Sequence, residues 1–157
     1  MGVMIIKKMT LILLGFIPLV LGFIMNSWIL ENPDSVLPFK LIGFAFLAFW
    51  VIVGFFGFKF EKTLVKSTLI AHIPALLALL LIMYQEIILG QFWSNLLGMA
   101  TQFYYLPLVN ISASVVGVFS FLLSGMKGLG SASLIALLLM FAAYYLGYYF
   151  SKYRSIQ

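Results

Sequence analysis

The side chains able to do chemistry are few in this chain, and they lie far apart. His72 is the single histidine, and cysteine is absent. An imidazole inside a membrane could carry a proton, because its charge changes near neutral pH and buried ionisable groups often mark ion paths. A neutral His72 bonded to a neighbouring helix, or to carbonyls freed by Pro74, explains the residue at equal cost. We favour this second, structural role.

Glu86 is the only acid inside a predicted membrane helix. It lies fourteen positions after His72, which is about 21 Å along a straight helix, so the two are not expected to form an acid–base pair. Tyr84 and Gln85 precede Glu86 near the predicted end of that helix. We therefore favour a carboxylate that reaches the water around the lipid headgroups.

A dense polar stripe follows Pro107. It contains Asn110, Ser112 and Ser114, and a helical repeat places Asn110, Ser114 and Gly117 on one face. Small and hydroxyl residues on one face are typical of close helix packing with hydrogen bonds between helices. The alternative is a polar lining for a solute path, opened at Pro107 as in the broken helices of transporters. We favour packing. The candidate polar site residues are therefore His72, Glu86, Asn110, Ser112 and Ser114.

We expect no enzyme, no cofactor and no metal centre. Catalysis needs a nucleophile or a base with an orienting partner, and the acids Glu31, Asp34 and Glu61 fall in predicted loops. A metal site at the histidine is disfavoured, because the chain has no cysteine or second histidine to complete it. A cation site formed by Glu31, Asp34 and Glu86 at one membrane face stays open, although nothing in the spacing demands it.

Composition indicates which elements must position these side chains. Of 157 residues, 64% are hydrophobic and 8% are charged, whereas a soluble domain has about a quarter charged residues. In a bilayer every backbone amide must be bonded within the protein, which allows only helices or closed barrels. The apolar runs here are long and apolar on every face, unlike barrel strands. We therefore predict an all-α, polytopic integral membrane helical bundle.

A crossing helix needs about 20 residues, and five runs of that length fit in the chain. They form a single transmembrane domain, 1–157. An amphipathic segment over about 90–101 contains Trp93 and is typical of the membrane interface or of a re-entrant turn. The predicted crossings are about 9–30, 40–58, 67–89, 102–124 and 131–150.

The distribution of Lys and Arg sets the predicted orientation, because cytoplasmic loops carry an excess of these residues. We place the protein in the cytoplasmic membrane of the cell as a multi-pass protein with a cytoplasmic N-terminus. Five crossings put the basic tail outside; a short sixth crossing at 87–101 would return it, but that length is short for a bilayer. With five crossings the inner side holds Lys7, Lys8, Lys59, Lys62, Lys66 and Lys127, and the outer side holds Lys40, Lys152 and Arg154.

Two further groups of residues have typical roles in membrane helices. Small residues let neighbouring helices approach closely, whereas aromatic and basic residues hold helix ends at the headgroups. The predicted helix-packing positions are Gly43, Gly54, Gly57, Gly117, Ala143 and Gly147. The predicted interfacial anchors are Trp28, Trp93, Tyr148, Tyr149, Tyr153, Lys152 and Arg154.

These patterns favour a small non-catalytic membrane protein that serves as an accessory, regulatory, assembly or immunity-type subunit of a larger membrane system through helix–helix contacts. The alternative is a small transporter or channel component with a polar path near His72 and Asn110. The expected partners are the lipid bilayer and another membrane protein or a second copy of this chain. Nucleic acid is not expected, because the nine Lys and Arg residues are spread over predicted loop ends and form no basic face.

Overall fold

The computed structural model describes residues 2–118 and 128–155, and of the side chains it describes those from residue 6 onward. The prediction of an all-helical chain is confirmed for these residues, which contain no strand. The elements in chain order are α1 (Gly2–Gly15), α2 (Ile17–Glu31), α3 (Phe39–Phe60), α4 (Leu64–Ala71), α5 (Ile73–Met83), the π-helical turn η1 (Tyr84–Ile88), α6 (Leu96–Tyr105), the 3-10 turn η2 (Leu106–Leu108), α7 (Val109–Val118) and α8 (Leu129–Arg154).

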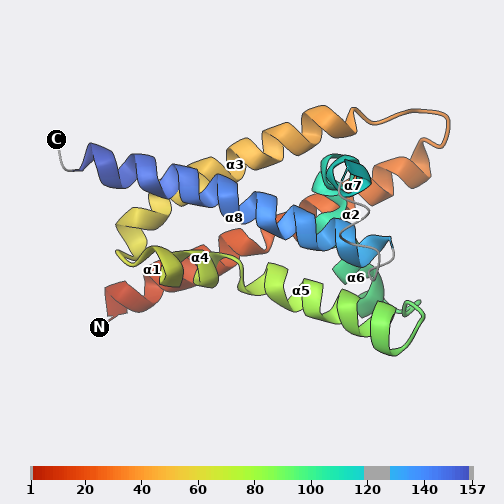
Figure 1. Cartoon of the computed structure of the whole chain (residues 1–157), viewed down its shortest axis with the longest axis horizontal. Coiled ribbons are helices and arrows are strands. Elements are labelled where there is room, and N and C mark those ends of the chain that lie inside the picture. The colour runs from red at the N-terminus through yellow and green to blue at the C-terminus, as the bar shows by residue number, and fades with distance from the viewer. Residues whose placement is uncertain (1, 119–127, 156–157) are drawn as a thin grey trace.

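Most helices follow the long axis of the molecule (Figure 1). Helices α3 and α8 lie side by side along this axis, and α1 with α2 and α4 with α5 form two interrupted rods against them. Helix α7 is seen end-on, so it runs across the axis. The start of α1, the turn between α3 and α4 and the end of α8 lie at one end of the molecule, and the turns after α2 and η1 lie at the other. We call these the α8-end and the α2-end, after the helices that finish there.

Three helical segments are long and apolar enough to cross a membrane: Ile6–Glu31, Phe39–Phe60 and Leu129–Arg154. A fourth crossing is possible if Leu64–Ala71 and Ile73–Ile88, which meet at an angle of 61°, are counted as one broken span. The described residues therefore hold three or four candidate crossings, and the five-crossing bundle is not confirmed. Such helices indicate a membrane location.

The range 102–124, expected to be one straight crossing, has a different structure. Helix α6 begins at Leu96, inside the predicted interfacial segment, and its start is capped by Asn95, whose side chain accepts a hydrogen bond from the Gly98 N–H at 2.9 Å. Pro107, which has no N–H to donate, falls in the 3-10 turn that ends α6 and redirects the chain into α7. The part of the range beyond residue 118 lies outside the described residues.

Two of the long apolar runs are interrupted at a glycine or a proline. The predicted crossing 9–30 breaks at Phe16, and the Tyr104 hydroxyl donates to the carbonyl of Gly15 at 2.7 Å, which satisfies an acceptor at the end of α1. The predicted crossing 67–89 bends at His72, two residues before Pro74. Neither run is a straight helix.

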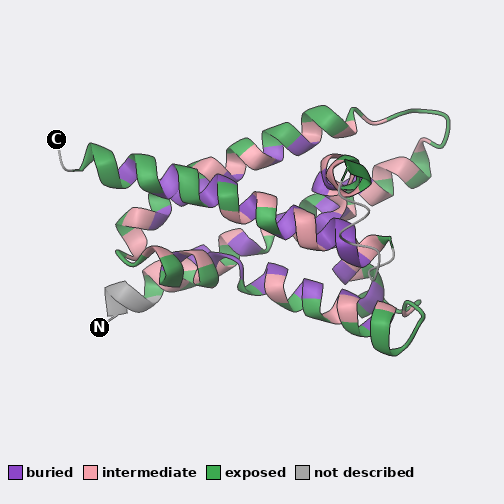
Figure 2. Ribbon diagram, in the orientation of Figure 1, coloured by how far each residue is buried: buried purple, intermediate pink, exposed green. Residues whose placement is uncertain are grey.

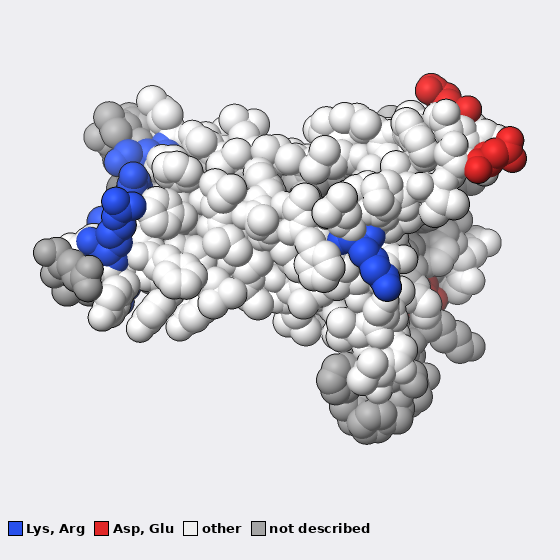
Figure 3. All heavy atoms as spheres, turned by 90° about the horizontal axis from the view of Figure 1, so that it is seen from above, with Lys and Arg blue, Asp and Glu red and all other residues white. Residues whose placement is uncertain are grey.

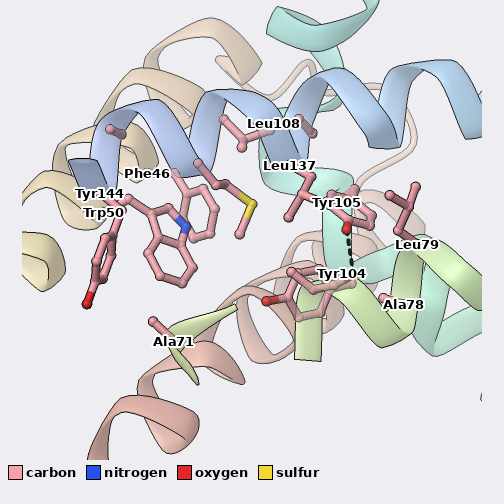
Figure 4. Close-up of a cluster of buried hydrophobic side chains, with 14 of the residues drawn as sticks. Phe46, Trp50, Ala71, Ala78, Leu79, Tyr104, Tyr105, Leu108, Leu137 and Tyr144 are labelled. Carbon is pink, nitrogen blue, oxygen red and sulfur yellow. Dashed lines mark hydrogen bonds between the residues drawn. The ribbon is translucent and has the colours of Figure 1, made fainter. Parts of the chain in front are cut away.

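The core is formed mainly by buried side chains of α3, α5, α6 and α8 (Figure 2). Helices α3 and α8 approach closely at two glycines: a Cβ at Gly54 would overlap the carbonyl oxygen of Tyr144, and a Cβ at Gly147 would overlap that of Val51. Trp50 and Tyr144 are fully buried next to this contact, and Figure 4 shows them together beside α8. The α3–α8 pair is therefore the spine of the bundle.

The outer faces of the bundle are apolar between its two ends. Leu13 in α1, Leu80 in α5 and Leu138 in α8 are 64%, 65% and 51% exposed. Figure 3 shows most Lys and Arg atoms of the drawn face at the α8-end and acids at the α2-end. Basic atoms also lie partway toward the α2-end, on a surface that is otherwise uncharged. An apolar exterior of this extent fits a lipid environment.

Candidate functional site

His72 lies fully buried at the bend between α4 and α5. Its ring is parallel to the indole of Trp50, with centroids 4.2 Å apart and planes at 22°. The rings of Phe141 and Tyr144 meet the imidazole edge-on, with centroid distances of 4.7 and 5.4 Å. Three aromatic side chains from α3 and α8 therefore enclose the histidine.

The polar atoms around His72 are only partly satisfied. Its Nδ1 bonds the carbonyl of Thr68 at 2.9 Å, which makes this nitrogen the donor and leaves Nε2 as an acceptor. Nε2 is buried without a partner, and so is the indole nitrogen of Trp50. Next to them, the Tyr144 and Ser67 hydroxyls lie 2.5 Å apart, and Ser67 Oγ also donates to the carbonyl of Gly57 at 3.2 Å. The arrangement ties α3, α4 and α8 together.

Glu86 and His72 are not brought together. Glu86 lies in η1, at the other end of α5 from His72. The carboxylate of Glu86 accepts a hydrogen bond from the backbone N–H of Gly130 at 2.7 Å, in the first turn of α8. A negative charge at a helix N-terminus is favourable, because the first N–H groups have no partner within the helix. Glu86 is thus half-buried and bonded within the protein rather than turned freely to water.

Gln85, which the sequence analysis did not select, is one of the most connected polar residues. It is fully buried, and its amide oxygen accepts from the backbone N–H of Trp93 at 2.8 Å. Its amide nitrogen donates to the carbonyl of Leu81 at 3.1 Å and reaches the hydroxyl of Thr101 at 3.5 Å. Gln85 therefore joins η1, the following turn and α6. Gln85 follows the entirely apolar helix α5, and a single amide at the end of such a helix is the signal that could have identified it.

The polar residues of α7 line two different hollows, a cavity and a groove. The Ser112 hydroxyl donates to the carbonyl of Leu108 at 3.0 Å, and its residue lines a cavity of about 190 Å³ together with Asn26, Gln102 and Ser133. Asn110 and Ser114 instead line a groove of about 220 Å³ that also contains Lys40, Phe44 and Ile111. His72 lies in neither of these hollows, because aromatic rings of α3 and α8 surround it. Ser112, the pair Asn110 and Ser114, and His72 therefore lie in three separate places.

Most of the small residues predicted to lie at helix contacts are packed against other parts of the same chain. A Cβ at Gly43 would meet the side chain of Ile111 at 2.6 Å, and one at Gly57 would overlap the hydroxyl of Tyr144. Ala143 is buried in α8, as is Gly147. Gly117 differs, because a Cβ there would meet none of the residues that the structure describes within 4 Å.

The predicted anchors also have different surroundings. Tyr148 is buried, and its hydroxyl donates to the carbonyl of Glu61 at 3.2 Å and to that of Lys62, which fastens α8 to the α3–α4 turn. Trp93 lies in the turn before α6, edge-on to Tyr84. Trp28 is half-buried in the last turns of α2. The remaining anchors are exposed in the last turns of α8: Tyr149, Lys152, Tyr153 and Arg154.

No group of three or more His, Asp or Glu side chains in the described parts of the chain is placed to hold a metal ion. No protein-family model, curated protein or solved structure matches this chain.

Proposed function

We propose that this chain is a non-catalytic membrane subunit that acts through contact with a helix of another membrane protein, and that α7 provides the contact. The observation that carries the proposal is the contrast between the glycines. The positions of Gly54 and Gly147 are closely approached by neighbours inside the bundle, whereas no described residue lies within 4 Å of a Cβ at Gly117 on α7. A small residue that no part of its own described chain approaches is free for a partner helix.

The surroundings of Gly117 support this use of α7. Ala113, four residues earlier, is exposed, and the pair has the small-xxx-small spacing found where membrane helices approach closely. Ser114 is exposed on the same side, and Asn110 Oδ1 is buried without a hydrogen-bond partner. Polar groups of this kind gain from hydrogen bonds across a helix–helix contact. Ala113, Ser114, Gly117 and Val118 are all exposed, so this face of α7 lies outside the core.

The arrangement of charges supports a placement of the bundle in the cytoplasmic membrane. Four crossings would bring both the start of α1 and the end of α8 to the same side. The α8-end would then hold Lys7, Lys8, Lys59, Lys62, Lys66, Lys152 and Arg154, and Lys40 would be on the other side with Glu31 and Asp34. This distribution favours the α8-end as the cytoplasmic one. With four crossings the basic tail returns to the cytoplasm without a short extra span.

The test is a photo-crosslinking amino acid placed at Ser114 in cells that produce the protein. We expect one adduct with a second membrane protein, and we expect its loss when Gly117→Leu fills the open face. The matched control is the same crosslinker at Leu80, which is exposed on α5. Equal adducts from both positions, or an adduct only with a second copy of this chain, would contradict the proposal.

A second candidate function, transport or binding of a small solute, is favoured by one observation. The cavity lined by Asn26, Gln102, Ser112 and Ser133 contains four polar side chains, and the Ser133 hydroxyl is buried without a partner. Solute sites in transporters lie where broken helices expose polar groups. Flux across liposomes that is lost in Ser133→Val and retained in His72→Phe would support this function over the first.

A further inference from the structure

A basic groove lies at the α8-end, between the last turns of α3 and α8. It has a volume of about 450 Å³ and carries three cations: Lys59, Lys62 and Arg154. Phe55 and Phe58 form its apolar side. Among the described residues that line it there is no acid. Cations from two helix ends beside aromatic rings make a surface with both charged and apolar character.

The two lysines are held by the aromatic rings of α3. Lys62 Nζ lies 3.9 Å from the ring centroid of Phe58. Lys59 Nζ lies 5.3 Å from the centroid of Phe56, outside the groove lining, and 5.9 Å from that of Phe55. A cation over a ring keeps its full charge and can still meet an anion on its other side. The nearby Glu61 carboxylate accepts a hydrogen bond from the backbone N–H of Thr63 at 3.3 Å. The ammonium groups are therefore positioned rather than neutralised.

The walls of the groove are fixed by the rest of the fold. The hydroxyl of Tyr148 in α8 donates to the backbone carbonyls of Glu61 and Lys62 in the α3–α4 turn. Ser151 and Ser155, from the last turns of α8, add hydroxyl groups to the lining. Since α3 and α8 are in contact at Gly54 and Gly147, the distance between the two walls is set before any ligand binds. Preorganisation of this kind lowers the cost of binding.

We propose that this groove binds the phosphate headgroup of an anionic phospholipid, with the acyl chains along Phe55 and Phe58. Basic pockets between membrane helices on the cytoplasmic side are suited to such headgroups. The aromatic side of the groove favours a lipid over free phosphate, because inorganic phosphate gains nothing from apolar surface. The inference goes beyond the proposed α7 contact, which lies on a different helix.

The experiment uses the purified full chain in detergent, titrated with phosphatidylglycerol and followed by native mass spectrometry. Replacing Lys59, Lys62 and Arg154 together by Gln should lower the affinity by about 100-fold, at about fivefold for each cation. The matched control replaces Lys7, Lys8 and Lys66 by Gln, which removes the same charge from the same end but leaves the groove intact. That control should bind like the wild type.

Several outcomes would overturn the proposal. Equal losses in the two triple variants would mean that general surface charge attracts the lipid, and equal binding of phosphatidylcholine would mean that the phosphate charge is not recognised. Displacement of the lipid by millimolar inorganic phosphate would assign the site to the free anion instead. The charge-preserving variant Lys59→Arg, Lys62→Arg, Arg154→Lys should keep the binding. Its failure despite a normal thermal melt would also count against the groove.

Discussion

The imidazole of His72 lies flat against the indole of Trp50, with ring centroids 4.2 Å apart. Both rings are fully buried, and the stack joins the bend between α4 and α5 to the middle of α3. The carbonyl of Thr68, one turn before His72, accepts a hydrogen bond from Nδ1–H at 2.9 Å. The contacts therefore explain His72 as a residue that fixes a helix bend.

This role predicts that His72→Ala destabilises the protein without any solute present. Loss of a fully buried ring leaves a cavity beside Trp50, which should lower the free energy of unfolding by about 3 kcal/mol. His72→Phe, which keeps an aromatic ring on the indole, should lose clearly less. Unfolding by sodium dodecyl sulfate in mixed micelles measures both. A His72→Ala variant as stable as the wild type would contradict the structural role.

Gly147 should tolerate no larger side chain. A Cβ there would overlap the carbonyl oxygen of Val51, so Gly147→Leu has to push α3 and α8 apart. Overpacking of this kind costs about 1–3 kcal/mol or more. Gly117→Leu is the matched control, because its site is open and the stability of the isolated protein should hardly change. The thermal midpoint in detergent distinguishes the two variants, and a similar midpoint for both would contradict the α3–α8 contact.

Glu86 should act as a cap for α8 rather than as a proton carrier. Glu86→Ala removes the acceptor of the Gly130 N–H and should cost about 1 kcal/mol. Glu86→Gln should cost less, because an amide oxygen still accepts that hydrogen bond. The same unfolding assay orders the three proteins. If Gln costs as much stability as Ala, the negative charge rather than the accepted hydrogen bond makes the contribution of Glu86.

Four crossings predict that Thr63 and Ser155 face one side of the membrane and Ser35 the other. All three are exposed, and the chain has no cysteine of its own, so single-cysteine variants are straightforward to label. In intact cells a membrane-impermeant maleimide should label Ser35→Cys alone. After permeabilisation it should label all three. Labelling of Ser155→Cys in intact cells would instead support five crossings.

Hydropathy predicted the helical class and the two helices of the spine closely. Helices α3 and α8 cover the expected ranges 40–58 and 131–150, because each is a single apolar run bounded by turn or polar residues. Gly54 and Gly147 were expected to pack, and their partners turned out to lie in the same chain. Composition tells which positions are small, but not which helix comes to meet them.

The path of the chain after Gly90 was not predictable by the same reasoning. A length of apolar residues near 20 indicates a crossing only if the helix stays straight, and Pro107 gave a turn instead. Gln85 was missed because a single amide beside Glu86 gives no periodic pattern, although it accepts a hydrogen bond from a backbone N–H eight residues later. The bonding partners of lone polar residues are set by tertiary structure.

The central position of α8 has a consequence for biogenesis. This helix leaves the ribosome after every other described element, yet Trp50, Gly54 and His72 are covered by its side chains and backbone. Until α8 enters the bilayer, Gly54 of α3 lacks the neighbour that packs against it, and the imidazole of His72 lacks the ring of Tyr144. Insertion of α8 is therefore the event that closes the bundle, and a chaperone or translocase would have to shield the unfinished helices until then.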